Sequence, residues 1–322
     1  MIKGKVIEVI SDIIKLELQD NRLCDANIKG IFRKEDIFPV VGDNVLVEVF
    51  EEDLDTIKDI EADKKQQEEK EEINKKTTKG IICEILERNV YIKRPKLANI
   101  TKLFFVVSID KPKPDLLMLD KQIAFAELLN LEIVIVFNKS DLGEQKFINE
   151  IKSVYENIGY KVIVIQANES RDNKGLLEIN KCLENNISAF SGNSGVGKST
   201  LINSIFSKNI TLEGEISRKN KKGKNTTTST KLYKIGNNTY IADTPGFSTF
   251  SIEEISYRDL DKYYKEFKEH ISKCEFVGCT HIKEENCKVK IAASENLISK
   301  KRYDRYIKIY EELKLKEERK RW

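Results

Sequence analysis

Alternation of apolar and polar residues dominates the first 85 residues of the chain. Runs 5–10, 13–18 and 44–50 place apolar side chains at roughly every second position, which is the period of a half-buried β-strand. Gly30, Pro39 and Gly42 separate the runs, and no helical pattern lies between them. This pattern predicts a small β-barrel over residues 1–85, with the OB-fold as the natural candidate. RNA binding by such a barrel is only weakly indicated.

From residue 86 onward, continuous apolar runs replace the alternation. Each is short enough for a buried strand, and one is followed by helical apolar spacing over residues 200–206. The apolar runs cover 103–107, 133–137, 162–165, 187–191 and 239–242. We therefore predict an α/β domain over residues 86–252 and a separate C-terminal region over 253–322. Residues 61–79 are nearly all charged or polar, which predicts a solvated insert before the last barrel strand.

A glycine-rich loop follows the apolar run 187–191. The pattern G-x-x-x-x-G-K-[ST] turns backbone N–H groups toward phosphates, supplies a lysine for the β- and γ-phosphates, and offers a hydroxyl to Mg²⁺. A strand before the loop and a helix after it are the context that this motif needs. The predicted phosphate-binding residues are Gly192, Asn193, Ser194, Gly195, Val196, Gly197, Lys198, Ser199 and Thr200, with Ser199 as a Mg²⁺ ligand.

A base-recognition motif, Asn138-Lys139-Ser140-Asp141, follows the strand 133–137. The Asp141 carboxylate can accept from the ring N–H and the exocyclic amine of guanine, and adenine presents neither donor there. Asn138 and Lys139 are predicted to brace the loop and cover the ring. A weaker third segment places the Ala167 backbone N–H on the guanine oxygen, although Gln166 stands where a serine is usual.

A further strand, 239–242, ends in Asp243-Thr244-Pro245-Gly246. An aspartate at the end of a strand beside the phosphate loop completes the Mg²⁺ shell, and the Gly246 N–H can face a γ-phosphate. The basic, threonine-rich run 218–228 can close over Mg²⁺ when a triphosphate is bound. We predict Lys198, Thr227 and Gly246 as the catalytic residues. The pattern does not distinguish Thr227 from Thr226 or Thr228 for this role.

The order of these motifs is unusual, because the base motif precedes the phosphate loop. This order resembles the circularly permuted GTPases, and more closely the RsgA (YjeQ) family of small ribosomal subunit-dependent GTPases. The resemblance implies GTP hydrolysis during late maturation of the small subunit, with rRNA contacts. It leaves the water-positioning group unassigned, because Asn225 stands where the family commonly has histidine and Phe247 where Ras-like switches have glutamine.

Other functions stay open at this stage. The chain could be a nucleotide-regulated RNA-binding module in which hydrolysis is incidental, or a permuted GTPase that acts on the large subunit. An ATPase or kinase is disfavoured by the base motif. The intrinsic rate is expected to be slow, with a partner completing the site.

The C-terminal region contains Cys274, Cys279, His281 and Cys287. Three thiolates and an imidazole form a closed tetrahedral set that suits a structural Zn²⁺, although this is not the spacing of ordinary zinc fingers. Buried free cysteines are the alternative, and a disulfide is disfavoured because no secretory signal opens the chain. The resemblance implies zinc here. His270 is expected to be a surface or packing residue.

The chain ends in a predicted helix whose residues Tyr303, Tyr306, Tyr310 and Leu313 form one apolar stripe. Segment 297–322 has ten Lys or Arg against five Asp or Glu, so its polar face either is simply solvated or contacts rRNA phosphates. The net charge of +3 makes any RNA contact local. No apolar run reaches the ~20 residues of a membrane span, and we expect a cytoplasmic monomer.

Overall fold

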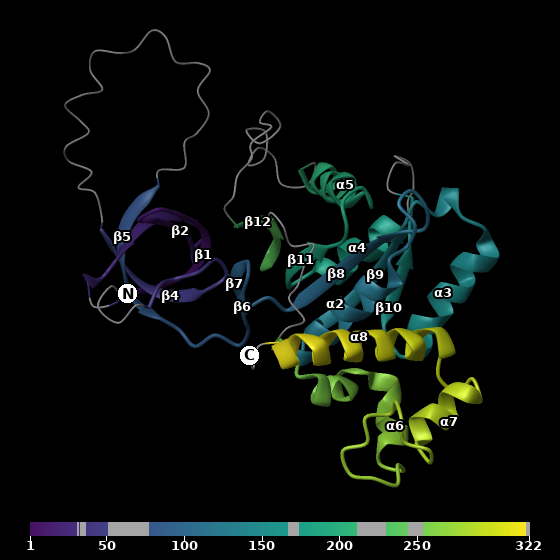
Figure 1. The fold of residues 1–322 in the computed structure, drawn as a ribbon. Helices are drawn as coiled ribbons and strands as arrows, with labels where there is room; N and C mark the ends of the chain where they lie inside the picture. The colour runs from purple at the N-terminus through teal and green to yellow at the C-terminus, as the bar shows by residue number, and fades with distance from the viewer. Residues whose placement is uncertain are drawn as a thin grey trace, which may run out of the picture. The chain divides into compact units, whose positions relative to one another are not determined.

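The computed structural model describes residues 1–30, 32, 37–50, 77–166, 174–210, 230–243 and 254–319. These residues form two compact units, one chiefly of residues 1–100 and the other chiefly of residues 101–322 (Figure 1). Among the described residues, no helix combines the length and the apolar character that crossing a bilayer requires.

The first unit is a closed five-stranded barrel. The strands pair in the order β1-β2-β3-β5-β4, and β4 pairs back onto β1. Only the β3–β5 pair is parallel, and the others are antiparallel. The strands are β1 (Ile2–Ile10), β2 (Ile13–Leu18), β3 (Leu23–Ile28), β4 (Asn44–Phe50) and β5 (Thr78–Ile85). The prediction of an OB-like barrel is confirmed.

Alternation along the barrel strands directs aliphatic side chains inward. Val6, Leu16, Val45, Val47 and Ile82 are each fully buried in this core. Most of the predicted charged insert lies outside the described residues, but its last residues do not match the prediction. Thr78 and Lys79 already belong to β5, because the β4 and β3 backbones extend the ladder to pair with them.

The barrel is followed by a short hairpin of β6 (Tyr91–Lys93) and β7 (Lys96–Ala98). Gly42, in the turn before β4, adopts φ +93°, and a Cβ there would lie 2.0 Å from the Ala98 carbonyl oxygen. Asp43 beside it is completely buried and accepts from the Val40 N–H and the Arg88 guanidinium. This turn therefore needs its glycine and is fixed by a charged pair.

The second unit contains a sheet in which β10, β9, β8 and β11 are parallel neighbours, followed by β13 and β12. The strands are β8 (Lys102–Ser108), β9 (Glu132–Asn138), β10 (Lys161–Val164), β11 (Ile187–Ser191), β12 (Lys231–Gly236) and β13 (Thr239–Asp243). The helices between them are α2 (Leu116–Leu128), α3 (Gln145–Asn157), α4 (Lys174–Leu183) and α5 (Lys198–Ile210). The predicted α/β domain is present.

Helices cover both faces of this sheet. Phe104, Val106 and Phe190 pack with the apolar residues of α4 and α5 on one face. Successive strand residues point to opposite faces, and α2 and α3 pack on the other one, where Tyr155 of α3 lies 6.2 Å from the Phe137 ring. The carboxyl ends of β9 and β11 therefore meet at one edge, where the base motif and the glycine-rich loop begin.

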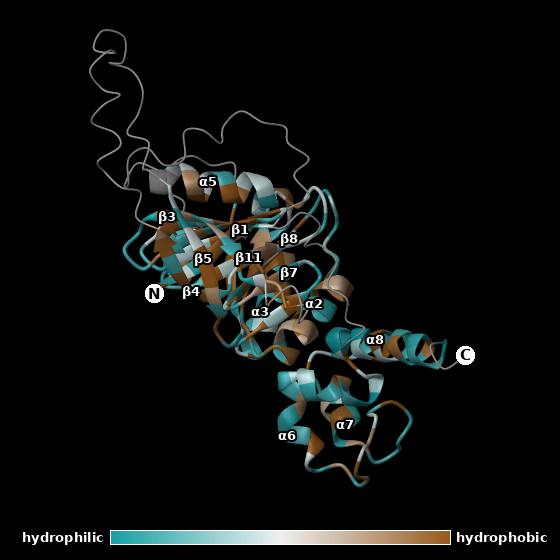
Figure 2. Cartoon of the chain, turned by 90° about the vertical axis from the view of Figure 1, so that its left-hand side faces the viewer, coloured by the Kyte–Doolittle hydropathy of each residue, from teal (hydrophilic) through white to brown (hydrophobic). Residues whose placement is uncertain are grey.

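The remainder of the second unit is helical. Its elements are η6 (Tyr257–Tyr263), η7 (Lys265–Phe267), α6 (Lys268–Ile271), α7 (Lys288–Ser294) and α8 (Lys300–Arg319). Helix α8 shows alternating apolar and polar residues in Figure 2. Tyr303, Tyr306, Tyr310 and Leu313 are all buried, which confirms the predicted apolar stripe. Beneath them lies a core that also includes Tyr264 and Phe267.

Candidate nucleotide site and metal centre

The glycine-rich loop joins the end of β11 to the start of α5. Gly195 and Gly197 have φ +80° and +91°, which L side chains rarely adopt. Helix α5 begins at Lys198, so the loop backbone lies at a helix N-terminus, where N–H groups favour an anion. The Lys198 ammonium donates to the Gly192 carbonyl oxygen at 3.1 Å, across the mouth of the loop. Two glycines at positive φ and a helix N-terminus are backbone features that a phosphate-binding loop requires.

The base motif is tied directly to this loop. Asn138, which is 2% exposed, donates from Nδ2 to the Val196 carbonyl oxygen at 2.9 Å. The Lys139 ammonium donates to the Gly195 carbonyl oxygen at 2.7 Å, although the two residues are 56 positions apart. A Cβ at position 197 would lie 2.3 Å from Asn138 Nδ2. The structure therefore brings together the two motifs on which the sequence analysis depends.

Asp141 lies in a short 3-10 helix, η3 (Ser140–Leu142), and its side chain is exposed. Lys139, which precedes this turn, adopts the left-handed conformation with φ +60°. The turn is held by the Ser140 N–H, which donates to the Ile165 carbonyl oxygen at 3.2 Å. This leaves the Asp141 carboxylate in solvent, beside the loop to which Asn138 and Lys139 are bonded.

Ser199 is exposed in the first turn of α5, and Asp243 is exposed at the end of β13. A hydroxyl and a carboxylate oxygen are the hard donors that Mg²⁺ accepts, so both are chemically suited to their predicted role. Ala167, Thr227 and Gly246 lie outside the described residues, as do Asn225 and Phe247. Their predicted roles stay predictions.

Family models match both units of the chain. The RsgA GTPase model matches residues 85–253 and the RsgA N-terminal domain model matches residues 3–57. The chain belongs to the RsgA GTPase family. A "small ribosomal subunit biogenesis GTPase RsgA" of Clostridium botulinum (strain Eklund 17B / Type B) is 35% identical, covering 99% of this chain and 100% of the relative. One of Alkaliphilus metalliredigens is 34% identical, with 98% of both chains covered.

Solved structures support the same assignment. YjeQ from Thermotoga maritima has a TM-score of 0.76 at 28% identity and covers 97% of this chain and 98% of its own. YloQ, described as a circularly permuted GTPase, has a TM-score of 0.74 at 25% identity, with 98% and 96% covered. The predicted permuted GTPase fold and the predicted family resemblance are both confirmed.

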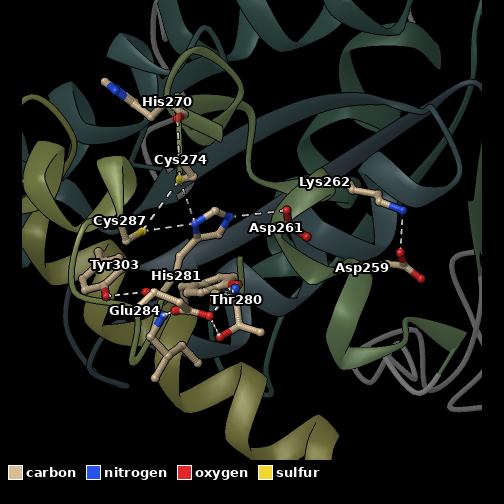
Figure 3. A network of polar contacts seen from close by, with 12 residues as sticks. Asp259, Asp261, Lys262, His270, Cys274, Thr280, His281, Glu284, Cys287 and Tyr303 are labelled. Atoms are coloured by element: carbon tan, nitrogen blue, oxygen red, sulfur yellow. Dashed lines mark hydrogen bonds and ion pairs between the residues drawn. The ribbon is translucent and has the colours of Figure 1, made fainter. Parts of the chain in front are cut away.

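The three cysteines and the histidine of the C-terminal region converge on one point. Figure 3 shows Cys274, His281 and Cys287 of this cluster. Their candidate ligand atoms all lie within 4.8 Å of one another. His281 Nδ1 is 3.3 Å from Cys287 Sγ and 3.7 Å from Cys274 Sγ, and these two sulfurs are 4.0 Å apart. A tetrahedral zinc would separate two sulfurs by about 3.8 Å and a sulfur from a nitrogen by about 3.5 Å. The residues present therefore fit a zinc ion.

Two further groups lie close to His281, one beside its ring and one at its backbone. Its Nε2 lies 3.5 Å from Asp261 Oδ2, and its backbone carbonyl accepts from the Tyr303 hydroxyl at 2.6 Å. A carboxylate behind a ligating histidine orients the ring and makes it more basic. The Tyr306 hydroxyl binds the neighbouring Thr280 carbonyl at 2.9 Å. Helix α8 thus holds the loop that carries His281, whereas His270 is not part of the cluster.

The protonation state of the cysteine thiols in this cluster is coupled to the binding of a cation. Burial raises the pKa of the Cys279 thiol to about 12 and also raises that of Cys287, so the protein alone favours neutral thiols. A divalent cation reverses this preference, because it binds the thiolate and releases the proton. Glu284 stabilises the same loop. Burial opposes its ionisation, but N–H groups and the hydroxyl of Thr280 outweigh burial and lower its pKa to about 2.

A buried ion network that the sequence analysis did not predict connects α2 with α8. Asp120, fully buried, accepts from the Arg302 and Arg305 guanidinium groups and from the Tyr155 hydroxyl. Arg302 also contacts Glu266 Oε1 at 2.5 Å. Burial opposes the charge of Arg302, but Asp120 and Glu266 outweigh it and raise its pKa well above the ordinary value. The sequence of α2 gave little signal, because Asp120 is followed there by Lys121 and Gln122 and is not distinguished by its local pattern.

Proposed function

We propose that the chain binds GTP and hydrolyses it to GDP and phosphate while acting in the biogenesis of the small ribosomal subunit. The pair of bonds from Asn138 and Lys139 to the phosphate loop carries this proposal, because it places guanine recognition beside phosphate binding. The names of the full-length relatives support the biological process. The proposed division is barrel 1–85, GTPase domain 86–252 and zinc-binding region 253–322.

Each residue has a defined task in this proposal. Asp141 selects guanine, Lys198 neutralises the β- and γ-phosphates, and the loop N–H groups hold the phosphate oxygens. Ser199 and Asp243 would hold Mg²⁺, which supplies charge neutralisation at the transferred phosphoryl group. Thr227 and the Gly246 N–H would close on the γ-phosphate, and the Ala167 N–H on the guanine oxygen. The two flanking residues that commonly orient water, at positions 225 and 247, are Asn and Phe.

The missing water-positioning side chain predicts slow intrinsic hydrolysis. A group supplied by a partner is worth roughly 10³–10⁵ in rate in related phosphoryl-transfer systems. We therefore expect purified small subunits to accelerate GTP hydrolysis strongly, measured as phosphate release under single-turnover conditions. Lys198→Ala is the control, and it should abolish the stimulated rate. Full-rate hydrolysis without subunits, or no stimulation by them, would count against the proposal.

Base selection gives a separate test. Asp141→Asn replaces one of the two carboxylate oxygens that accept from guanine by an NH2 donor, so one guanine donor is left facing another donor and the loss of GTP affinity should be roughly 10⁴-fold. The same variant should gain affinity for xanthosine triphosphate, because Asn can donate to the xanthine oxygen. Competition binding with GTP and xanthosine triphosphate measures this change in base preference. An unchanged preference for GTP would remove Asp141 from the site.

The Cys274, Cys279, His281 and Cys287 cluster is proposed to hold a structural Zn²⁺ with no open ligand position. The solvent-facing side of α8 is proposed to contact rRNA phosphates, because Lys308, Lys314 and Arg319 are exposed there. A chain truncated after residue 314 should bind small subunits more weakly, and less salt-dependently, than the full chain. A cytoplasmic location follows from this function, and the monomeric state stays a prediction.

A further inference from the structure

Helix α2 is buried on two opposite faces. Asp120 and Gln122, two positions apart, are 0% and 3% exposed. Residues two apart in a helix point in nearly opposite directions, so these polar side chains belong to different surroundings. Polar groups are buried at a cost unless they are hydrogen-bonded, and each of the two has partners in a different part of the second unit.

The first face of α2 meets the phosphate loop. Gln122 Nε2 donates to Ser191 Oγ at 2.9 Å, and Ser191 is the last residue of β11, directly before Gly192. At the start of α2, Asp115 accepts from the Met118 N–H and lies 3.4 Å from Asn193 Nδ2. Met118, Leu119 and Gln122 of the helix and Gly192 and Asn193 of the loop line one shared hollow. The start of the phosphate loop is therefore bonded to α2 at both Ser191 and Asn193.

The second face of α2 meets the C-terminal helices. Asp120 joins Arg302 and Arg305 of α8, and Lys121 pairs with Glu312 of the same helix. Ala124 belongs to the same apolar core as Tyr303 and Tyr306, whose hydroxyls hold the backbone of the loop that carries His281. A displacement of α8 relative to α2 would separate buried charges, which is strongly unfavourable.

We propose that α2 energetically links the nucleotide loop to the C-terminal helices, with Gln122 as a positioning residue for the loop and Asp120 as its anchor to α8. The inference rests on the proposed nucleotide binding. Linkage is reciprocal. Nucleotide that fixes the loop also stabilises the packing of α8, and α8 held in place pre-organises the loop for nucleotide. This coupling is carried by the contacts of α2 and does not require contacts made by the chain segment after Asp243.

Hydrogen exchange of the full-length, zinc-loaded protein tests the link. Saturating GDP should slow amide exchange in residues 303–313 about fivefold, which is the lower end of common coupling factors. In Gln122→Met the slowing should persist in the phosphate loop and disappear from α8. Lys152→Met is the matched control, because it removes an exposed ion pair with Glu156 within α3 and touches neither contact of α2, so it should keep the slowing.

A double-mutant cycle distinguishes positioning from packing. Gln122→Met should weaken GDP binding about fivefold, but it should have no further effect in a Ser191→Ala background, because the bond is already gone. If Gln122 acted only through packing, Gln122→Met would weaken GDP binding by the same factor in the wild-type and Ser191→Ala backgrounds. If Gln122→Met fails to fold, Ser191→Ala alone must still abolish the slowing in α8.

Two outcomes separate this inference from the proposed function. GDP that binds without slowing exchange in α8, or with equal slowing in wild type and Gln122→Met, overturns the link and leaves GTP hydrolysis intact. A protein that does not bind GDP at all overturns the proposed function, and the link with it.

Discussion

The core of the barrel and the core beneath α8 differ in the side chains that fill them. The barrel core is almost entirely aliphatic, with Leu16, Val45 and Ile82 fully buried. The α8 core contains buried tyrosines, a buried ion network and the cysteine–histidine cluster. Aliphatic packing tolerates exchange among residues of similar volume. Networks of hydrogen bonds and ion pairs tolerate substitution less well, because removing one residue leaves its partner as a buried polar group without a bond. The two regions should therefore respond differently to the same kinds of substitution.

Removal of a metal ligand should have the largest effect. A structural zinc site contributes apparent binding energy of about 10–16 kcal/mol to folding, so Cys287→Ser should release the metal and unfold residues 254–319 locally. Near-ultraviolet circular dichroism of the buried tyrosines and metal analysis would report this loss. Cys182→Ser is the control and should keep both the metal and the tyrosine signal. A metal-free Cys287→Ser with native tyrosine packing would contradict the prediction.

Loss of the buried carboxylate should come next. Asp120→Ala leaves Arg302 and Arg305 without their shared partner, and breaking a buried ion pair in this way costs about 3–5 kcal/mol. Urea unfolding followed by tyrosine fluorescence measures the change. Glu150→Gln removes an exposed ion pair between Glu150 of α3 and Lys301 of α8. This substitution should leave the unfolding midpoint unchanged. Equal effects of the two substitutions would show that burial of Asp120 is not energetically important.

A cavity in the barrel should cost less and stay local. Leu16→Ala removes a fully buried side chain, and such truncations cost about 2–5 kcal/mol, depending on how far the site collapses. Leu16→Met, which conserves volume, should cost below about 1.5 kcal/mol. Hydrogen exchange of strands β1 to β5 would measure both. Metal content should be the same in both variants, and its loss in Leu16→Ala would contradict the local response.

The smallest expected effect is the pH-dependent stabilisation that ionised Glu284 contributes. Its folded-state pKa is lowered to about 2, so its ionised form stabilises the loop above the ordinary pKa of about 4.3. That contribution is lost as pH falls from about 5 toward 2. The stability difference between wild type and Glu284→Gln should therefore shrink over this range, measured by thermal melting. Glu285→Gln is the control. A difference that is constant from pH 7 to 3 would contradict the assignment.

Patterns local in sequence were sufficient for part of the structure. Barrel strands β1, β2 and β4, the phosphate loop and the four candidate metal ligands follow from periodicity and spacing, because each depends on residues close together in the chain. Strand β3 was missed, because its buried positions are the small residues Cys24 and Ala26, and Asp25 beside them is of a type that is rare in strands. The boundary of β5 was wrong by a few residues, because strand length depends on the neighbouring strands rather than on local composition. Residue type alone also does not determine burial, because Cys24 is buried in the barrel core whereas Cys83 and Cys182 are only half-buried.

The ion network could not be predicted in this way. Nothing near Asp120 in the sequence indicates that Arg302 pairs with it, because α8 reaches α2 only through the tertiary fold. The same holds for Asp261 behind His281 and for Gln122 beside Ser191. Asp120 is one of several polar residues in α2, so the local pattern does not show that this one is buried or which residue pairs with it.

The separation between Asp120 and Arg302 also affects how the chain is made. The two residues are 182 positions apart. Synthesis proceeds from the N-terminus, so the barrel and the sheet can fold while Asp120 still lacks its arginines. Helix α2 reaches its final burial only after α8 has been synthesised and has packed against it. A growing chain therefore holds a phosphate loop whose support is incomplete until α8 has folded onto α2.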